Sequence, residues 1–107
     1  QTITVQNNQT LKITKDREKN VGGNQTAVIT GQDTETVTKD QKVMVKKNYT
    51  LDVTSVTTIK SGEKIELICG SSSITLESSG KITIAGSEFD FTASGPAKIC
   101  GKDVLIN

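Results

Sequence analysis

The sequence predicts an all-β fold in which three copies of the chain wind around one another as an intertwined triple-stranded β-helix. Residues 1–56 divide into seven blocks of eight, and the fifth place of every block is aliphatic. Apolar and polar residues alternate inside the blocks, which is the period of a strand with one inward face. The eighth place is Asn, Asp or Gln in six of the seven blocks, which indicates a corner. A short fixed period is typical of folds that stack similar units along one axis.

The third and fifth places of the blocks form the predicted core. They share one face of a strand, and the third place is apolar in five of the seven blocks. Val, Ile and Thr dominate the blocks, which favours strand over helix. The residues expected to line the trimer core are Ile3, Val5, Leu11, Ile13, Val21, Ile29, Val37, Val43, Val45, Leu51 and Val53.

Corners are expected at the seventh and eighth places, as at Gly23–Asn24 and Gly31–Gln32. Hairpins are not expected, because the chain has no Asn-Gly or Asp-Gly loop. Corners without reversal wind the chain around an axis. One chain winding alone would show an additional period of 24 residues, whereas three intertwined chains need only equal blocks of eight. A trimer also supplies a partner for every strand edge, and strands stacked at ~4.8 Å would give a prism about 60 Å long.

Two parts of this rod are predicted, residues 1–60 as a regular β-helix and residues 61–107 as its continuation. The register of eight is expected to loosen in the second part toward the C-terminal tip, although strand patterns such as Ile74-Thr75-Leu76 persist. Because Gln1 opens a complete block, we expect the chain to be a fragment of a longer array. Cys69 and Cys100 are too few for a disulfide framework, and Cys69 holds an inward fifth place, so free, buried thiols are expected.

Composition argues against enzymes, metal sites and nucleic-acid binding. The chain has 13 basic and 12 acidic residues, so its charge balance points to neither nucleic acid nor a membrane surface. It has no His, the commonest general base and a usual zinc ligand. Glu35 or Glu77 with Asp90 fits a solvated face better than a glycosidase pair. We therefore expect no catalytic residue, no cofactor and no metal.

Two blocks resemble the valine–glycine repeats of the VgrG spike proteins of bacterial type VI secretion, which are similar to the needles of contractile phage tails. These blocks are Val21-Gly22-Gly23-Asn24-Gln25-Thr26 and Ile29-Thr30-Gly31-Gln32-Asp33-Thr34. The stretch from Cys69 to Leu76, followed by Lys81-Ile82-Thr83-Ile84, is similar to the segment that follows the repeats in that family. Other blocks carry Lys15, Lys39 or Lys47 where the family pattern has its corner glycine, so the resemblance leaves the geometry of those corners open.

The resemblance implies a homotrimeric needle that punctures membranes mechanically. It implies an N-terminal base, absent from this chain, that contacts the tube protein. It also implies a C-terminal end that carries a PAAR-repeat tip protein or an effector. On this chain the docking platform would be Val104, Leu105, Ile106 and Asn107. Such a spike is assembled in the bacterial cytoplasm, then secreted or injected into a target cell, where it meets the target membrane transiently.

Two other functions remain open at this point. A phage tail-spike or fibre segment that binds a surface glycan would use the same rod. A monomeric β-helix of the ice-binding or adhesin type is the third possibility, although the fourth place of the blocks mixes Thr4 and Thr36 with Lys12, Met44 and Asp52, which would break an ice-binding plane.

Lys19 and Glu35 are the two charged residues of the third place, and a buried charge is costly unless it is paired. They lie two blocks apart, about 10 Å along the predicted axis at ~4.8 Å per strand. Either water or an ion inside the prism bridges them, or the register is locally slipped. We predict that replacing both by Val raises the midpoint of thermal unfolding, measured by circular dichroism. A clear fall in that midpoint would reject the hypothesis.

Overall fold

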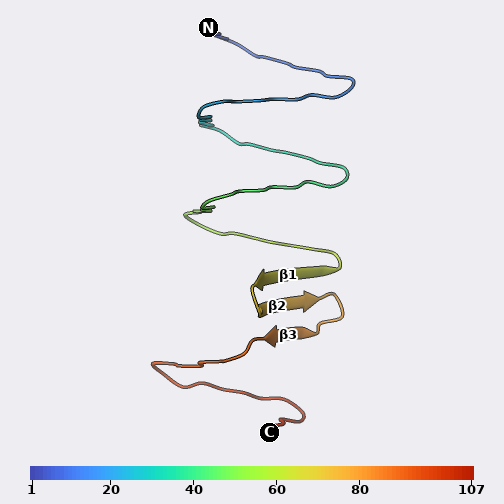
Figure 1. Cartoon of the computed structure of the whole chain (residues 1–107), viewed down its shortest axis with the longest axis vertical. Helices are drawn as coiled ribbons and strands as arrows, with labels where there is room; N and C mark the ends of the chain where they lie inside the picture. Colours follow the sequence, from blue (N-terminus) through green and yellow to red (C-terminus); the bar gives the residue numbers. More distant parts are fainter. The chain divides into compact units, whose positions relative to one another are not determined.

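The structure, a computed structural model, describes residues 1–107 and is all-β without a helix, as the sequence predicts. Its three strands are β1 (Lys64–Cys69), β2 (Ser72–Glu77) and β3 (Ile82–Ala85). They form one antiparallel sheet in the order β1-β2-β3 (Figure 1). The chain divides into two compact units, residues 1–47 and 48–107, and the sheet belongs to the second. The structure contains no candidate for a membrane-spanning helix.

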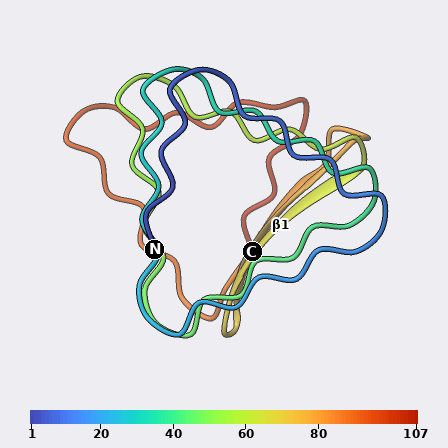
Figure 2. The same ribbon diagram turned by 90° about the horizontal axis from the view of Figure 1, so that it is seen from above.

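The first unit consists of extended segments separated by bends at eight-residue spacing. The bends lie at the sixth and seventh places of each block: Gln6–Asn7, Thr14–Lys15, Gly22–Gly23, Thr30–Gly31, Thr38–Lys39 and Lys46–Lys47. The chain passes around an axis at these bends instead of folding back on itself (Figure 2). No segment of this unit forms a backbone–backbone hydrogen bond with another, so none is a paired strand.

The bends fall one residue earlier than the sequence suggested. Gly22–Gly23 bends, whereas Asn24, expected to complete that corner, opens the next extended segment. The glycines are also not required by the backbone, because the only residues with positive φ in the chain are Gly70 and Gly80. A bend with ordinary negative φ accepts any L-residue, so Lys15 occupies the same place as Gly23 without strain.

Hairpins do occur in the second unit, and the expectation that the chain lacks them is wrong for residues 64–85. β1 and β2 are antiparallel, with Leu67 opposite Ile74 and Cys69 opposite Ser72. The two-residue loop between them is Gly70–Ser71, and Gly70 has φ 55°. Glycine at the first central position is the signature of a type II′ turn, which reverses a strand as effectively as Asn-Gly does. The Gly-Ser pair was the sequence signal for this reversal.

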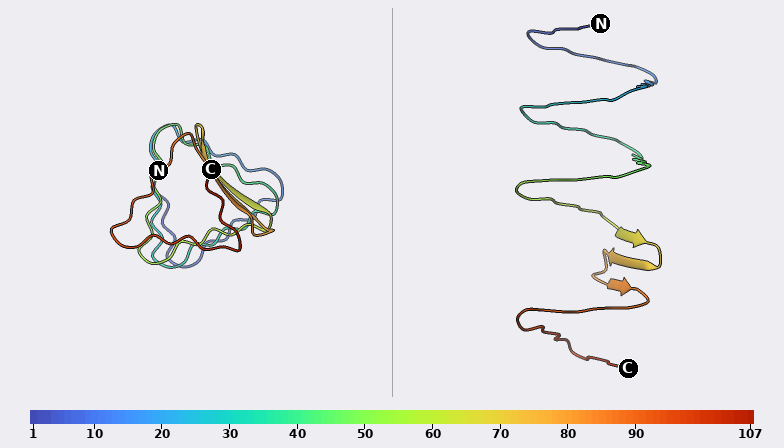
Figure 3. Two further views of the ribbon diagram at one scale, coloured as in Figure 1. Left: turned by 90° about the horizontal axis from the view of Figure 1, so that it is seen from below. Right: turned by 60° about the vertical axis from the view of Figure 1, so that its left-hand side comes forward.

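A three-residue loop makes the second reversal. Ser78, Ser79 and Gly80 connect β2 to β3, and the Gly80 amide donates to the Glu77 carbonyl at 3.0 Å. The Glu77 amide in turn donates to the Lys81 carbonyl at 3.0 Å, and Gly80 has φ 94°. A tight turn followed by a glycine with positive φ is the usual form of a three-residue hairpin. Figure 3 shows the resulting three strands side by side.

Turns and bends keep their eight-residue spacing through the second unit. The apolar residues of β2 and β3, however, occupy other places of the eight-residue block than those of β1. Turns or bends lie at Thr54–Ser55, Gly62–Glu63, Gly70–Ser71, Ser78–Ser79, Ser87, Ser94–Gly95 and Lys102. On the apolar face the residues of β1, Ile65 and Leu67, are odd-numbered, whereas those of β2 and β3 are even-numbered. A two-residue reversal requires this switch, because Leu67 must share a face with Ile74 across the loop.

Candidate oligomerisation interface

The chain has no buried residue of its own. Every large aliphatic or aromatic side chain is at least partly exposed, and only Ile65, Ser73, Thr75 and Gly86 are half-buried. Burial of apolar surface is the main favourable contribution to folding, at roughly 25 cal/mol per Å². A chain that keeps all of its apolar side chains in contact with water lacks that contribution. The surface that other chains would cover is therefore the functional site of this molecule.

The predicted core residues of the blocks are uncovered within one chain. The fifth-place residues are the least exposed of them, at 43–56% between Val5 and Val53. The third-place residues Ile3, Leu11, Val43 and Leu51 are more exposed. No intrachain contact buries any of these side chains, so their placement in a core requires another chain.

The backbone of these segments also lacks backbone hydrogen-bond partners within the chain. All three backbone–backbone hydrogen bonds outside the strand ladders lie between Glu63 and Lys81. The amides and carbonyls of residues 1–62 therefore have no backbone partner within the chain. Extended segments with unpaired edges are templates for pairing with further strands. Other chains can satisfy both the apolar side chains and the backbone of the same segments.

The sheet has one apolar and one mostly polar face. The pairing places two rows on the apolar face: Ile65, Leu76 and Ile82, and beside it Leu67, Ile74 and Ile84. The opposite face carries Glu66, Thr75 and Thr83 in one row and Ile68, Ser73 and Ala85 in another. No second layer of the chain covers the apolar face, because these residues stay partly exposed. These residues are not among the core residues predicted from the sequence. The signal that could have found them is the change from odd-numbered apolar residues in β1 to even-numbered ones in β2.

An ion pair on the polar face illustrates how open this face is. The Lys64 Nζ lies 3.0 Å from the Glu66 Oε1, and both side chains are about half exposed. The hydrogen bond to Glu66, reinforced by its charge, raises the pKa of Lys64 above its ordinary value. Exposed pairs of this kind contribute little to stability. The polar face is consequently suited to water, unlike the face behind it.

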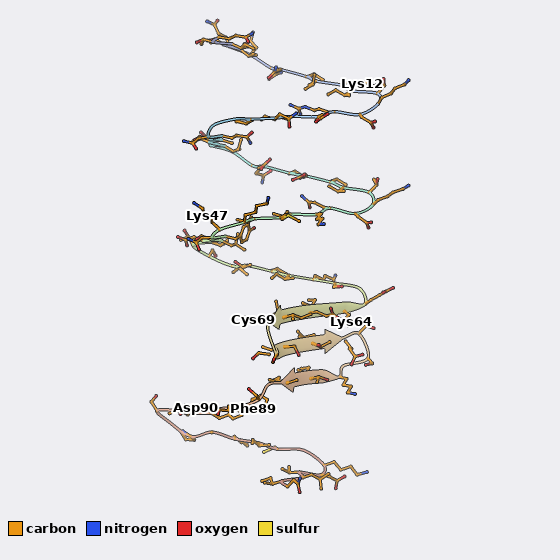
Figure 4. The ribbon with its side chains drawn as sticks, in the orientation of Figure 1. Lys12, Lys47, Lys64, Cys69, Phe89 and Asp90 are labelled. Carbon is orange, nitrogen blue, oxygen red and sulfur yellow. The ribbon has the colours of Figure 1, made fainter.

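A groove of about 480 Å³ lies at the Cys69 end of the sheet. Its apolar walls include Leu67, Ile74, Ile84 and Phe89. The Phe89 ring stacks on that of Phe91, with centroids 5.8 Å apart and planes 10° from parallel. Figure 4 shows Cys69 at the end of β1 and Phe89 just after β3. Ile68, Ser73 and Ala85 also line the groove, so both faces of the sheet contribute to it.

The two cysteines are free, as the sequence suggested, but both are exposed in the chain rather than buried. Cys69 occupies the apolar face of the sheet, opposite Ser72, so only another chain could bury it. No group of three or more His, Cys, Asp or Glu side chains is arranged to hold a metal ion.

The charged residues of the third place keep the spacing of their neighbours. Lys19 and Glu35 lie between bends that are eight residues apart, from Thr14–Lys15 to Thr38–Lys39. A local slip of the register would have displaced one of those bends, so the slipped alternative is not supported. Ala27 holds the third place between them.

Leu105 and Ile106 are the most exposed large apolar residues of the chain. Leu105 is 99% exposed and Ile106 is nearly as open, whereas Val104 is about half exposed. Almost no intrachain packing covers Leu105 and Ile106. The structure therefore leaves Val104 to Asn107 free to contact another molecule.

A family model described as the bacteriophage T4 gp5 C-terminal trimerisation domain matches residues 1–84. The chain belongs to this family. The resemblance to spike needles inferred from the sequence is thereby confirmed, and the family is a trimerisation domain of a phage-tail spike. The family accordingly supports a homotrimer of this chain. No curated protein matches the chain significantly.

The interface can be tested with two valines of the first unit that lie on opposite faces. Val37, at a fifth place, is 44% exposed, and Val28, at a fourth place, is 84% exposed. We predict that Val37→Ser destabilises the trimer by about 2 kcal/mol per chain, because a side chain buried by its partners becomes polar. Val28→Ser should change stability by less than about 0.5 kcal/mol. The measurement is denaturant unfolding at one fixed protein concentration, and equal effects of the two substitutions would contradict this interface.

Proposed function

We propose that the chain is the needle segment of a type VI secretion spike, wound as an intertwined triple-stranded β-helix that transmits axial force during membrane puncture. One observation carries the proposal. In this chain of a trimerisation family, residues 1–47 bend every eight residues around an axis, and the backbone of residues 1–62 has no backbone partner within the chain. Strands from two further chains, inserted between successive turns, would satisfy both requirements at once.

The proposed role is structural, without catalysis or a cofactor. Residues 1–60 would form the regular prism, and residues 61–107 would continue it toward the tip. In a closed prism every strand is bonded on both edges, so strands unfold together rather than one at a time. Such a rod resists axial load, which is the mechanical property that a puncturing needle requires. The N-terminal end would continue into the base that contacts the tube protein.

The proposed assembly can be measured directly on this chain. Light scattering should give a mass of about 34 kDa, three times the 11.4 kDa of one chain, because the core closes only when three copies combine. A well-folded monomer would overturn the proposal. Binding of the trimer to bacterial surface glycans would instead favour a phage tail-spike that recognises a receptor, since a needle should bind none.

The proposed tip partner is a PAAR-repeat protein or an effector that docks on Val104 to Asn107. This location rests on exposure, because apolar side chains without intrachain contacts occur most often at interaction surfaces. The spike would be assembled in the bacterial cytoplasm and then delivered into a target cell with its tip foremost.

Leu105→Asp tests the docking platform. We predict that this variant stays a trimer but loses co-elution with a purified PAAR-repeat protein, because a carboxylate would be buried without a partner in the contact. Ser94→Asp adds the same charge at a bend outside the platform and should retain co-elution. If Leu105→Asp co-elutes as the unmodified chain does, the C-terminal residues are not the docking site.

A further inference from the structure

The balanced net charge of the chain conceals an uneven distribution of charge along it. Residues 1–47 carry eight basic and five acidic residues, whereas residues 48–107 carry five basic and seven acidic residues. The positive excess gathers near the end of the first unit, because residues 36–51 contain four lysines and a single acid, Asp40. These four lysines are called the lysine band, and they are Lys39, Lys42, Lys46 and Lys47.

The lysine band is exposed and has no ion-pair partner within the chain. All four side chains are exposed, and the one ion pair of the chain joins Lys64 to Glu66. Three of the four lysines lie at bends of the first unit, as Figure 4 shows for Lys47. The backbone does not require lysine at such bends, because Asn7 and Gly23 hold the equivalent place elsewhere and none of these bends has a positive φ. The fold therefore does not account for this concentration of positive charge.

An apolar side chain lies between two lysines of the band. Val43 and Val45 hold the third and fifth places, so the alternation of a strand turns Lys42, Met44 and Lys46 to the opposite, outward face. Met44 is 68% exposed, and a trimer that covers the third and fifth places leaves it in water. An apolar side chain flanked by lysines matches the interface of a bilayer, where ammonium groups meet lipid phosphates and the apolar side chain reaches the acyl boundary.

We propose that the lysine band binds the anionic headgroups of a lipid bilayer. The inference rests on the proposed needle and names the surface through which that needle meets a membrane. Three-fold symmetry would place twelve lysines and three aspartates around the rod at one level, so the band would meet the headgroups that surround a rod crossing a bilayer. A nucleic acid would attract the same lysines but would leave Met44 in water, and for this reason the occupant is lipid.

Matched pairs of lysines in the first unit test the role of charge. Lys42→Gln with Lys46→Gln removes two charges from the band, and Lys12→Gln with Lys15→Gln removes two outside it. We expect the parent trimer to sediment with vesicles of equal parts phosphatidylcholine and phosphatidylglycerol, and not with phosphatidylcholine alone. The band variant should bind the mixed vesicles about tenfold more weakly, and the control variant should stay within about twofold of the parent. Equal weakening by both would overturn the proposal, since binding would then follow overall charge.

Met44→Ser tests the contact with lipid at unchanged charge. It should bind the mixed vesicles about threefold more weakly and leave the weak attraction to a short DNA duplex unchanged, whereas Val28→Ser, at the same place of another block, should change neither. If Met44→Ser binds the vesicles as the parent does, the band is a general site for polyanions and the assignment to lipid is wrong. A parent trimer that ignores the mixed vesicles overturns the lipid site and leaves the needle standing. A monomeric parent in light scattering overturns the needle and this inference with it.

Discussion

The structure depends on one constraint, which is that a single chain of this sequence cannot cover its own apolar places. Its hydrophobic residues are short, evenly spaced and few, at 33% of the chain with only 3% aromatic. A globule needs these residues to converge on one centre, but here a bend every eight residues distributes them along an axis. Outside the sheet, burial and backbone pairing have to come from other copies, so folding of those residues is coupled to assembly.

The same constraint explains why the corners tolerate such different residues. Where the chain only bends, φ stays negative and Lys15 or Gly23 serves equally well. Where the chain reverses, at Gly70 and Gly80, φ is positive and a side chain would be strained. Glycine is therefore needed for reversal and only accommodated at the bends. The sheet that results from reversal is the one part of the molecule with internal strand pairing.

The proposed function rests on the apolar surfaces that the chain leaves uncovered. Continuous columns of small aliphatic residues suit a thin rod of three chains, whereas the open C-terminal residues from Val104 to Asn107 suit an end-on contact. The mechanical role proposed above requires no catalytic residue, and the composition fits it. Membership of a phage-tail trimerisation family agrees with that role.

The sequence alone determined the all-β class, the spacing of eight and the family, because each depends on local alternation and on a period that repeats along the chain. It did not determine the exact bend residues, since Asn24 and Gly23 are both good corner residues and only backbone geometry distinguishes them. It also did not reveal the reversal at Gly70–Ser71, although the change from odd to even apolar places recorded it. Only the tertiary structure placed Leu67 opposite Ile74, and Ile74 opposite Ile84. One apolar face is thereby made from three blocks, because strand pairing joins residues that local patterns describe separately.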